Sequence, residues 1–348
     1  MDIYSLGYLN GVVLSLKRTP AFLLNTFFNQ VVLAEQDTVY FDVETDGTKR
    51  RLAPIVHPLV PGKLVESRGY ETKSIKPAYV KDLRVHDATR PFKRTIGEQI
   101  GTGGTLTNAQ RAELAIRADL RDQTDMLTRR MEVWASQILR TGSLSMNMLM
   151  PDGAEKAITL NFGRHADLTI ALGSGTYWGE SGVDPLVDLE EWALDVLQKS
   201  GSVVRNIVMD PAAWGVFRAS SLLEKKLDLR RVKAGEIDLG TIPDHIQYKG
   251  NDGTFDYWVY ADWYLADGAS TETAMMPRGT VLGVGDIMGV RHFGAIKDEA
   301  AGFQAREYFS KSWVVEDPSA RMLLLQSAPV LAPYRPNAGF AATVLPPA

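Results

Sequence analysis

The sequence predicts an α+β protein in which one long helix, antiparallel strand pairs and an inserted α/β segment share one chain. Three patterns predict this class. Residues 107–140 carry an unbroken apolar stripe at helical spacing. Residues 143–162 and 302–331 each hold two alternating runs around a turn rich in Pro and Asp, which is typical of hairpins. Residues 183–298 alternate between helix-like and strand-like runs, as α/β segments do.

The long helix is defined by one narrow apolar stripe: Ile116, Leu120, Leu127, Met131, Trp134 and Ile138. Thr107 or Asn108 can cap its start, and Gly142 follows its end. Glu113–Arg117 and Asp125–Arg129 have the i,i+4 spacing of ion pairs. A helix of this length spans roughly 50 Å, which exceeds the need of a compact domain. Without a sustained heptad, a coiled coil is disfavoured. Two interpretations of this helix remain open: a spine with a sheet laid along it, and a long helix in a large α+β enzyme.

Composition excludes several classes of function. The 348 residues are 45% hydrophobic and 23% charged, with a formal net charge of −4, which disfavours a dedicated nucleic-acid binder. The chain has no cysteine, so disulfides, thiolate metal sites and a cysteine nucleophile are excluded. The start of the chain lacks a signal-peptide pattern, and no apolar run is long enough to predict a membrane span.

The N-terminal third begins with an apolar segment, residues 1–36, that must be buried. The segment could be buried in the core of its own chain or against a neighbouring subunit, and the neighbouring subunit is favoured. Residues 22–33 are expected to form one short helix. Residues 38–43 and 49–56 have strand composition around the turn signal Asp46-Gly47.

Residues 57–104 have a different character, with four prolines, many charges and little core of their own. Short alternating runs at 63–67 and 71–75, around Gly69, predict an extended hairpin. A segment of this length exceeds ordinary loops, which indicates a function. The glycine-rich residues 101–104 lack the Gly-Lys-Ser/Thr ending of a phosphate-binding loop, so a flexible hinge is favoured.

The inserted segment opens with Asp184-Pro185, an N-cap and first turn for a helix that reaches Lys199 before Gly201. Asp210-Pro211 opens a third helix, expected to reach about residue 229. Strand-like runs are expected at 203–209, 247–249, 255–260 and 281–284. The proline-rich C-terminal tail is expected on the surface.

No catalytic, cofactor-binding or metal-binding residue is assigned. The histidines are scattered and form no metal-ligand motif: His57, His86, His165, His245 and His292. Asp210 is the best catalytic candidate because it ends a buried strand, but Pro211 favours an N-cap role. A basic run has the composition of a solvated helix end, with weak contact to DNA as the alternative: Lys225, Lys226, Arg230, Arg231 and Lys233.

Four segments in this order resemble the major capsid protein family of phage lambda, the head protein E family, which has the Hong Kong 97-type capsid fold. They are residues 20–28, 53–80, 210–231 and 308–329. The resemblance extends from about residue 20 to 345 and is weaker over 163–182 and 234–280.

The resemblance implies a structural protein of a tailed-phage head and no enzyme. Hexamers and pentamers would form an icosahedral shell that holds the viral DNA, assembled in the host cytoplasm and located in the virion. The resemblance implies that the chain is divided into five parts. They are an N-terminal arm with the first strands (1–56), an extended loop lapping an adjacent subunit (57–104), the spine helix and peripheral domain (105–182), an axial domain (183–298), and a closing β-ribbon with the tail (299–348).

The resemblance also implies partners. A separate scaffold protein, a portal, a cement or decoration protein and weakly bound packaged DNA are expected, and no cofactor is. Some relatives crosslink covalently, but no crosslink is assigned to the loop lysines Lys63, Lys73, Lys76 and Lys81. A bacterial nanocompartment shell and an α/β enzyme using Asp210 are the alternatives.

Overall fold

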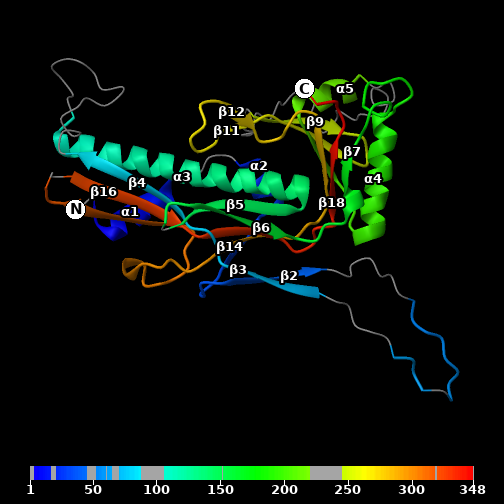
Figure 1. Cartoon of the computed structure of the whole chain (residues 1–348), viewed down its shortest axis with the longest axis horizontal. Coiled ribbons are helices and arrows are strands. Elements are labelled where there is room, and N and C mark those ends of the chain that lie inside the picture. The colour runs from blue at the N-terminus through cyan, green and yellow to red at the C-terminus, as the bar shows by residue number, and fades with distance from the viewer. Residues whose placement is uncertain are drawn as a thin grey trace, which may run out of the picture.

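A computed structural model describes residues 4–16, 21–44, 52–59, 61–64, 70–87, 106–150, 152–219, 245–317 and 320–347 of the chain. The body is elongated, and helix α3 (Asn108–Thr141) runs along one of its long edges in Figure 1. Strands lie beneath this helix, and a second group of strands and helices lies at one end of it. The predicted α+β class is confirmed. No helix in the described stretches is long and apolar enough to cross a membrane.

The predicted spine helix is confirmed almost residue for residue. Thr107 is the N-cap: its side chain accepts the Gln110 N–H, and the Gln110 side chain accepts the Thr107 N–H in return. Gly142 ends the helix at a φ of 67°, a left-handed conformation that glycine adopts without strain. The expected Glu113–Arg117 ion pair forms at 2.9 Å.

The other ion pair expected on this helix is wrong. Asp125 lies 3.9 Å from Arg121 and does not pair with Arg129. Both arginines are four residues from Asp125, so helical spacing alone could not decide between them. Arg129 therefore has no ion pair with any described residue.

The N-terminal segment folds onto its own chain, so the expected burial against a neighbour is wrong for the described residues. Helix α1 (Leu6–Ser15) packs against α3 and β15, and Leu9 is fully buried. The single helix expected over 22–33 is also wrong. Helix α2 (Phe22–Phe27) ends early, and strand β1 (Gln30–Leu33) follows because its β-branched valines pair in parallel with β14 (Gly289–Phe293).

The sheet beneath the first half of α3 has three described strands. Strand β16 (Ala320–Ser327) lies between β15 (Phe309–Val315) and β4 (Val80–Asp87), and both pairings are antiparallel. The expected closing ribbon is thus confirmed in its central part. Its ends differ: η4 (Glu299–Ala301) and a turn precede β15, and β17 (Pro329–Pro333) leaves the ribbon to pair with β14.

Two further strand pairs flank this sheet. The hairpin of β5 (Ser143–Leu149) and β6 (Glu155–Asn161) confirms its prediction. Strand β2 (Val39–Glu44) was expected to pair with residues 49–56, but it pairs with β3 (Tyr70–Ile75), and described residues 52–56 form no strand. The hairpin expected around Gly69 is only partly described: its second run, 71–75, pairs with β2, whereas Gly69 and residues 65–67 of its first run lie outside the described residues.

A sheet of six described strands forms the end of the body. Its order is β7 (Thr169–Ala171), β18 (Gly339–Thr343), β13 (Thr280–Val284), β8 (Asn206–Met209), β10 (Asp256–Tyr260) and β9 (Ile246–Asn251). Helices α4 (Pro185–Ser200) and α5 (Pro211–Phe217) lie beside it. The shared core includes Trp178, Trp192, Phe217, Tyr257 and Phe340.

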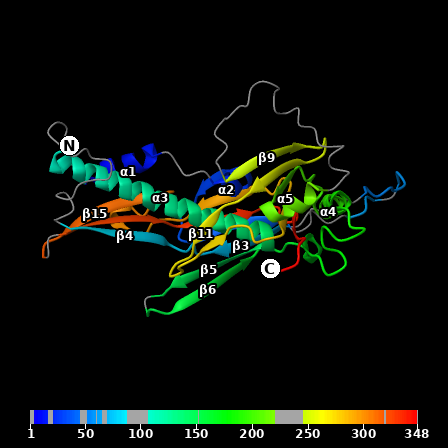
Figure 2. The same ribbon diagram turned by 90° about the horizontal axis from the view of Figure 1, so that it is seen from above.

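Helix α4 has the predicted caps, Asp184 and Gly201. The third helix, expected to reach about residue 229, ends at Phe217, and residues 220–244 lie outside the described part of the chain. The short elements η2 (Ala166–Leu168) and the hairpin of β11 (Trp263–Leu265) and β12 (Glu272–Ala274) complete the described chain; the hairpin lies beside α3 (Figure 2).

The C-terminal tail is not a surface segment, which corrects the sequence prediction. Strand β18 lies between β7 and β13, and Phe340 is buried against Trp192, 5.5 Å between ring centroids. The small residues of the strand explain this placement. Ala341 and Ala342 let the backbone approach its neighbours closely, so only Phe340 needs a large pocket. A proline-rich composition gave no sign of a central strand.

Candidate functional site

One acidic side chain lies in the apolar interior where α3 meets the N-terminal segment. Glu132 is 2% exposed. Its carboxylate accepts the N–H groups of Leu23 at 2.9 Å and Leu24 at 2.8 Å, and the Tyr260 hydroxyl donates to it at 2.9 Å. The N-cap residue of α2 is Ala21, which has no side-chain acceptor, so Glu132 caps this helix from another element. Burial raises the pKa of Glu132 to about 7.

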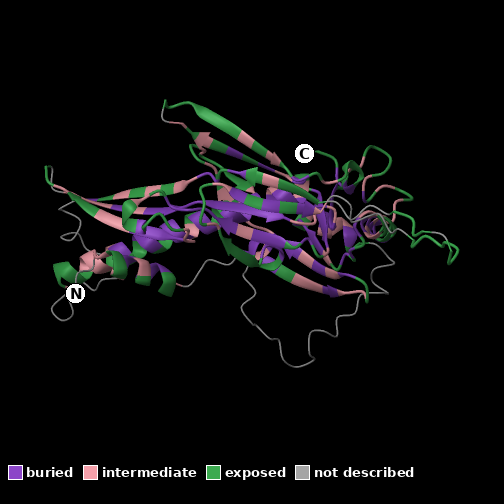
Figure 3. Cartoon of the chain, turned by 90° about the horizontal axis from the view of Figure 1, so that it is seen from below, coloured by how far each residue is buried: buried purple, intermediate pink, exposed green. Residues whose placement is uncertain are grey.

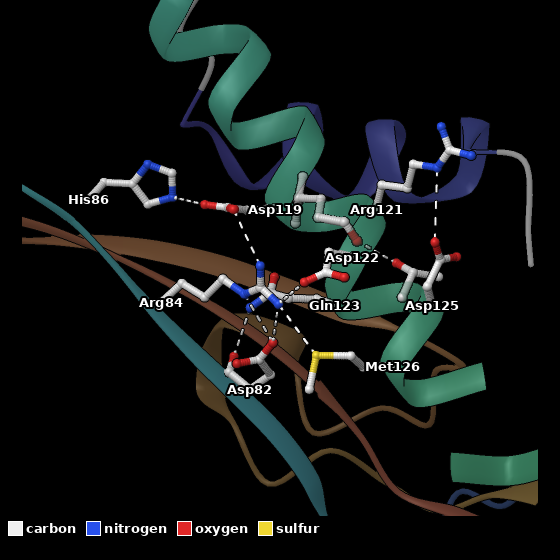
Figure 4. Close-up of polar contacts among 11 residues, drawn as sticks. Asp82, Arg84, His86, Asp119, Arg121, Asp122, Gln123, Asp125 and Met126 are labelled. Carbon is white, nitrogen blue, oxygen red and sulfur yellow. Dashed lines mark hydrogen bonds and ion pairs between the residues drawn. The ribbon is translucent and has the colours of Figure 1, made fainter. Parts of the chain in front are cut away.

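A second polar cluster joins strand β4 to α3 (Figure 4). The Arg84 guanidinium lies 2.6 Å from Asp122, 3.1 Å from Asp82 and 3.3 Å from Asp119. The Nε2 of His86 lies 2.8 Å from the other oxygen of Asp119, which is 7% exposed. Burial acts to lower the pKa of Arg84, but the carboxylates of Asp122 and Asp82 outweigh it and raise that pKa. The guanidinium therefore stays charged and holds the strand to the helix.

Replacing Arg84 by leucine is expected to lower the free energy of unfolding by about 3 kcal/mol, because Asp119 would stay buried without its guanidinium partner. Urea unfolding of the unassembled chain measures this. The matched control is Arg117→Leu, which removes an exposed ion pair and is expected to cost less than about 1 kcal/mol. Equal losses in the two variants would contradict a structural role for the cluster.

The segment leading out from β2 carries apolar side chains that the described chain does not cover. Residues 52–59 and 61–64 are exposed throughout, and Figure 3 shows this segment in green, away from the body. Leu59 is 88% exposed, and Leu52, Ile55 and Leu64 are more exposed still. In Figure 1 the segment leaves the lower edge of the molecule. Large apolar side chains left exposed in this way are a general feature of protein–protein interaction sites.

The four lysines considered for a crosslink have ordinary surroundings. Lys63 is exposed. The Nζ of Lys73 donates to the backbone oxygen of Asn161 at 2.6 Å, and Lys76 lies 3.7 Å from Asp37. None of the four contacts an asparagine side chain among the described residues. No crosslink is therefore assigned.

Asp210 is an N-cap in the structure. Its buried carboxylate accepts the N–H groups of Ala212 at 3.0 Å, Ala213 at 3.1 Å and Gly279 at 3.0 Å. Burial raises the pKa of Asp210, and the three backbone donors oppose that shift. These bonds tie α5 to the loop before β13, so the position of the carboxylate is explained without catalysis.

The described histidines do not converge on a site. His86 and His165 each have one aspartate neighbour, and burial lowers the pKa of His292 to about 4, which keeps it neutral. No group of three His, Asp or Glu residues able to hold a metal occurs in the described stretches. The proposed hinge, residues 101–104, and the basic run 225–233 lie outside them.

The two polar clusters on α3 were not predicted from the sequence. Glu132 and Asp119 each directly adjoin a residue of the apolar stripe, Met131 and Leu120 respectively. An acidic residue beside a helical stripe lies on the flank of the buried face, so its position was a usable signal. The partners of Glu132 and Asp119 come from distant parts of the chain, so no local pattern in the sequence indicated them.

These features together describe a subunit with a well-packed body and an exposed apolar segment that leaves it. A family model described as phage major capsid protein E matches residues 5–344. The chain belongs to the phage major capsid protein E family, and it is a structural protein of a tailed-phage capsid, located in the virion.

Relatives and a solved structure agree with this assignment. The major capsid protein of Escherichia phage lambda is 29% identical over 290 residues, covering 80% of this chain and 82% of that protein. The major capsid protein of Escherichia phage N15 is 26% identical over 341 residues, covering 95% and 96%. The crystal structure of a prophage protein from Escherichia coli CFT073, assigned as a capsid protein, has a TM-score of 0.74 at 20% identity over 98% and 99% of the chains.

The comparisons bear on the alternative functions that the sequence left open. The Hong Kong 97-type fold expected from the resemblance is confirmed. The nanocompartment interpretation is not favoured, because the family model and the relatives are phage capsid proteins. The family is structural and is not a family of enzymes.

Proposed function

We propose that copies of this chain form the hexamers and pentamers of an icosahedral shell around the phage DNA, and that residues 57–104 lap over an adjacent subunit. The observation that carries the proposal is the exposed apolar run around Ile55, Leu59 and Leu64. Burying one leucine side chain contributes about 2 kcal/mol. A closed shell repeats that contact in every subunit, so weak single contacts add up to a stable assembly.

The five-part division expected from the sequence is part of this proposal, with one amendment. The axial domain, residues 183–298, would include two strands from outside that range, because β7 and β18 belong to its sheet. Residues 105–182 and 299–348 would supply the remaining peripheral domain around α3.

The proposed partners follow from the family. A separate scaffold protein would guide assembly, a portal would occupy one vertex, and a cement protein would bind the outer surface. Packaged double-stranded DNA would make weak, non-specific contact, in keeping with a formal net charge of −4.

Leu59→Asp is expected to abolish closed particles in negative-stain electron microscopy, because it places a charge in an apolar contact. Leu59→Ile, the matched control, keeps the contact apolar and is expected to assemble. Both variants should keep the thermal midpoint of the unassembled chain, because Leu59 is 88% exposed there. Normal particles from Leu59→Asp would contradict the proposal.

A further inference from the structure

Arg335 lies where the six-stranded end sheet meets the sheet of β1, β14 and β17. Strand β13 of the end sheet leads to β14 through residues 285–288, and β17 leads back to β18 through the loop that holds Arg335. The two loops are bonded to each other. The N–H of Arg335 donates to the Ile287 oxygen at 3.1 Å, and the N–H of Gly285 donates to the Ala338 oxygen at 2.9 Å. The chain therefore crosses twice between the two sheets at this junction.

The Arg335 guanidinium joins two further parts of the chain at the junction. Its Nε donates to a carboxylate oxygen of Glu44 at 2.9 Å, and a terminal nitrogen donates to the backbone oxygen of Ser200 at 3.0 Å. Glu44 is the last residue of β2, and Ser200 is the last residue of α4. In Figure 1, β2 and α4 lie towards the same end of the body. One side chain thus contacts the end of a strand and the end of a helix.

Both contacts suit the chemistry of arginine. The guanidinium is planar and carries several donors in a fixed fork, so it can hold two acceptors in one arrangement. The Ser200 oxygen lies at the C-terminus of α4, where helix carbonyls lack intrahelical donors and carry a partial negative charge. The Arg335 and Glu44 side chains are 23% and 33% exposed, so their charged hydrogen bond is partly shielded from water.

The junction itself has little freedom to deform. Met288, just before β14, has a φ of 47°, which a residue with a side chain rarely adopts unless its surroundings impose it. The Ser202 hydroxyl, two residues beyond α4, accepts the Asp286 N–H at 3.1 Å. A Cβ on Gly285 would lie 2.7 Å from that hydroxyl oxygen. The loop 285–288 and the end of α4 are therefore packed as one unit.

We infer that Arg335 is a positioning residue that links the base of the segment leaving β2 to helix α4. Because the guanidinium holds Glu44 and Ser200 together, a displacement of α4 and the end sheet also displaces the end of β2. Strand β3 moves with β2, since Glu44 pairs with Tyr70 across the two strands. The position of the end sheet and the direction in which the exposed segment leaves the body are thus set together. This coupling lies within one chain and goes beyond the proposed shell function.

Two spin labels measure the coupling in the unassembled chain, which has no cysteine of its own. Tyr70→Cys on β3 and Leu194→Cys on α4 carry the labels at positions that are 70% and 63% exposed. Double electron–electron resonance is expected to give one narrow distance distribution. Adding Arg335→Leu is expected to broaden it about twofold, because no other side chain at this position can hold both acceptors. The matched control is Lys297→Leu, which removes an ion pair with Asp37 just before β2 and should leave the width unchanged.

Two further variants separate this link from a general loss of structure. Glu44→Leu breaks the same link from the β2 side and is expected to broaden the distribution as well, so the test does not depend on the folding of Arg335→Leu. Glu44→Arg with Arg335→Glu restores an ion pair but places a carboxylate beside the Ser200 oxygen, which offers it no donor. The distribution is therefore expected to stay broad in this charge-exchanged variant.

The outcomes decide the inference. An unchanged width in folded Arg335→Leu or in Glu44→Leu would overturn it, and so would a broad distribution in the labelled parent chain. Equal broadening by Lys297→Leu would show that any lost ion pair near β2 has the same effect, which also contradicts a specific link. A narrow distribution in the charge-exchanged variant would show that the ion pair acts without α4 and would overturn the coupling.

Discussion

Glu132→Ala is expected to lower the free energy of unfolding by about 4 kcal/mol. The substitution leaves the buried N–H groups of Leu23 and Leu24 and the Tyr260 hydroxyl without an acceptor, and each unsatisfied donor costs about 1–3 kcal/mol. Urea unfolding of the unassembled chain measures the loss. Glu191→Ala, an exposed residue of α4, is the control and is expected to change stability by less than about 0.5 kcal/mol.

The same residue gives the stability of the chain a defined pH dependence. The pKa of Glu132 rises from 4.5 to about 7 on folding, chiefly because of burial. A raised carboxyl pKa means that the folded state binds the proton more tightly. The stability contributed by this group is therefore complete below about pH 4.5 and is lost as the pH rises through about 7.

Glu132→Gln isolates that dependence because glutamine does not titrate. The stability of the wild type minus that of the variant is expected to fall by up to about 3 kcal/mol between about pH 5 and about pH 8. Urea midpoints across this range measure the difference. If it stays constant with pH, Glu132 is not the titrating group.

Gly283→Ala is expected to lower the free energy of unfolding by about 3 kcal/mol, the second large effect. A Cβ at this position in β13 would lie 2.0 Å from Cε1 of Phe340 in β18. That ring is held by Trp192 and the core around it, so the strain cannot be relieved cheaply. Gly215→Ala is the control, because a Cβ there meets nothing within 4 Å, and stability is expected to hold or rise slightly.

A double substitution tests the cause of that loss. Phe340→Ala alone is expected to cost about 4 kcal/mol by leaving a cavity. Combined with Gly283→Ala, it removes the ring that the new methyl group would strike, so the joint loss should fall short of the sum by about 2 kcal/mol. Additive losses would show that the two strands do not meet through these atoms.

The elements predicted correctly are those whose signals are local. The apolar stripe, Thr107 and Gly142 defined α3, and Asp184 with Gly201 defined α4, because caps act within one turn of the residues they stabilise. Asp210 was correctly interpreted as an N-cap on the same grounds. The turn between β5 and β6 likewise contains the residues that its backbone requires.

The errors come from contacts between distant segments. Strand β2 pairs with β3 and not with the nearer described residues 52–56, because pairing depends on which segment offers a buried face. Strand β18 enters the end sheet from a tail that looks unstructured by composition. The N-terminal segment was correctly expected to be buried, but apolar composition could not identify its partner, which is its own chain.

The candidate site was predictable only in outline. The resemblance indicated residues 57–104 as a contact segment, which stays a prediction; the described residues 52–59 and 61–64 are exposed. Arg129 was expected to pair with Asp125, but it has no ion pair with a described residue because Asp125 lies near Arg121 instead. Only the folded chain brings Met126 and Leu265 to one surface beside Arg129.

The most direct test of this account is the reactivity of a single thiol at Leu59→Cys in a chain that has no other cysteine. We expect rapid maleimide labelling of the unassembled protein, where this position is exposed, and strong protection after closed particles form. Equally fast labelling in closed particles would show that the exposed segment around Leu59 has no partner in the shell and would contradict the account.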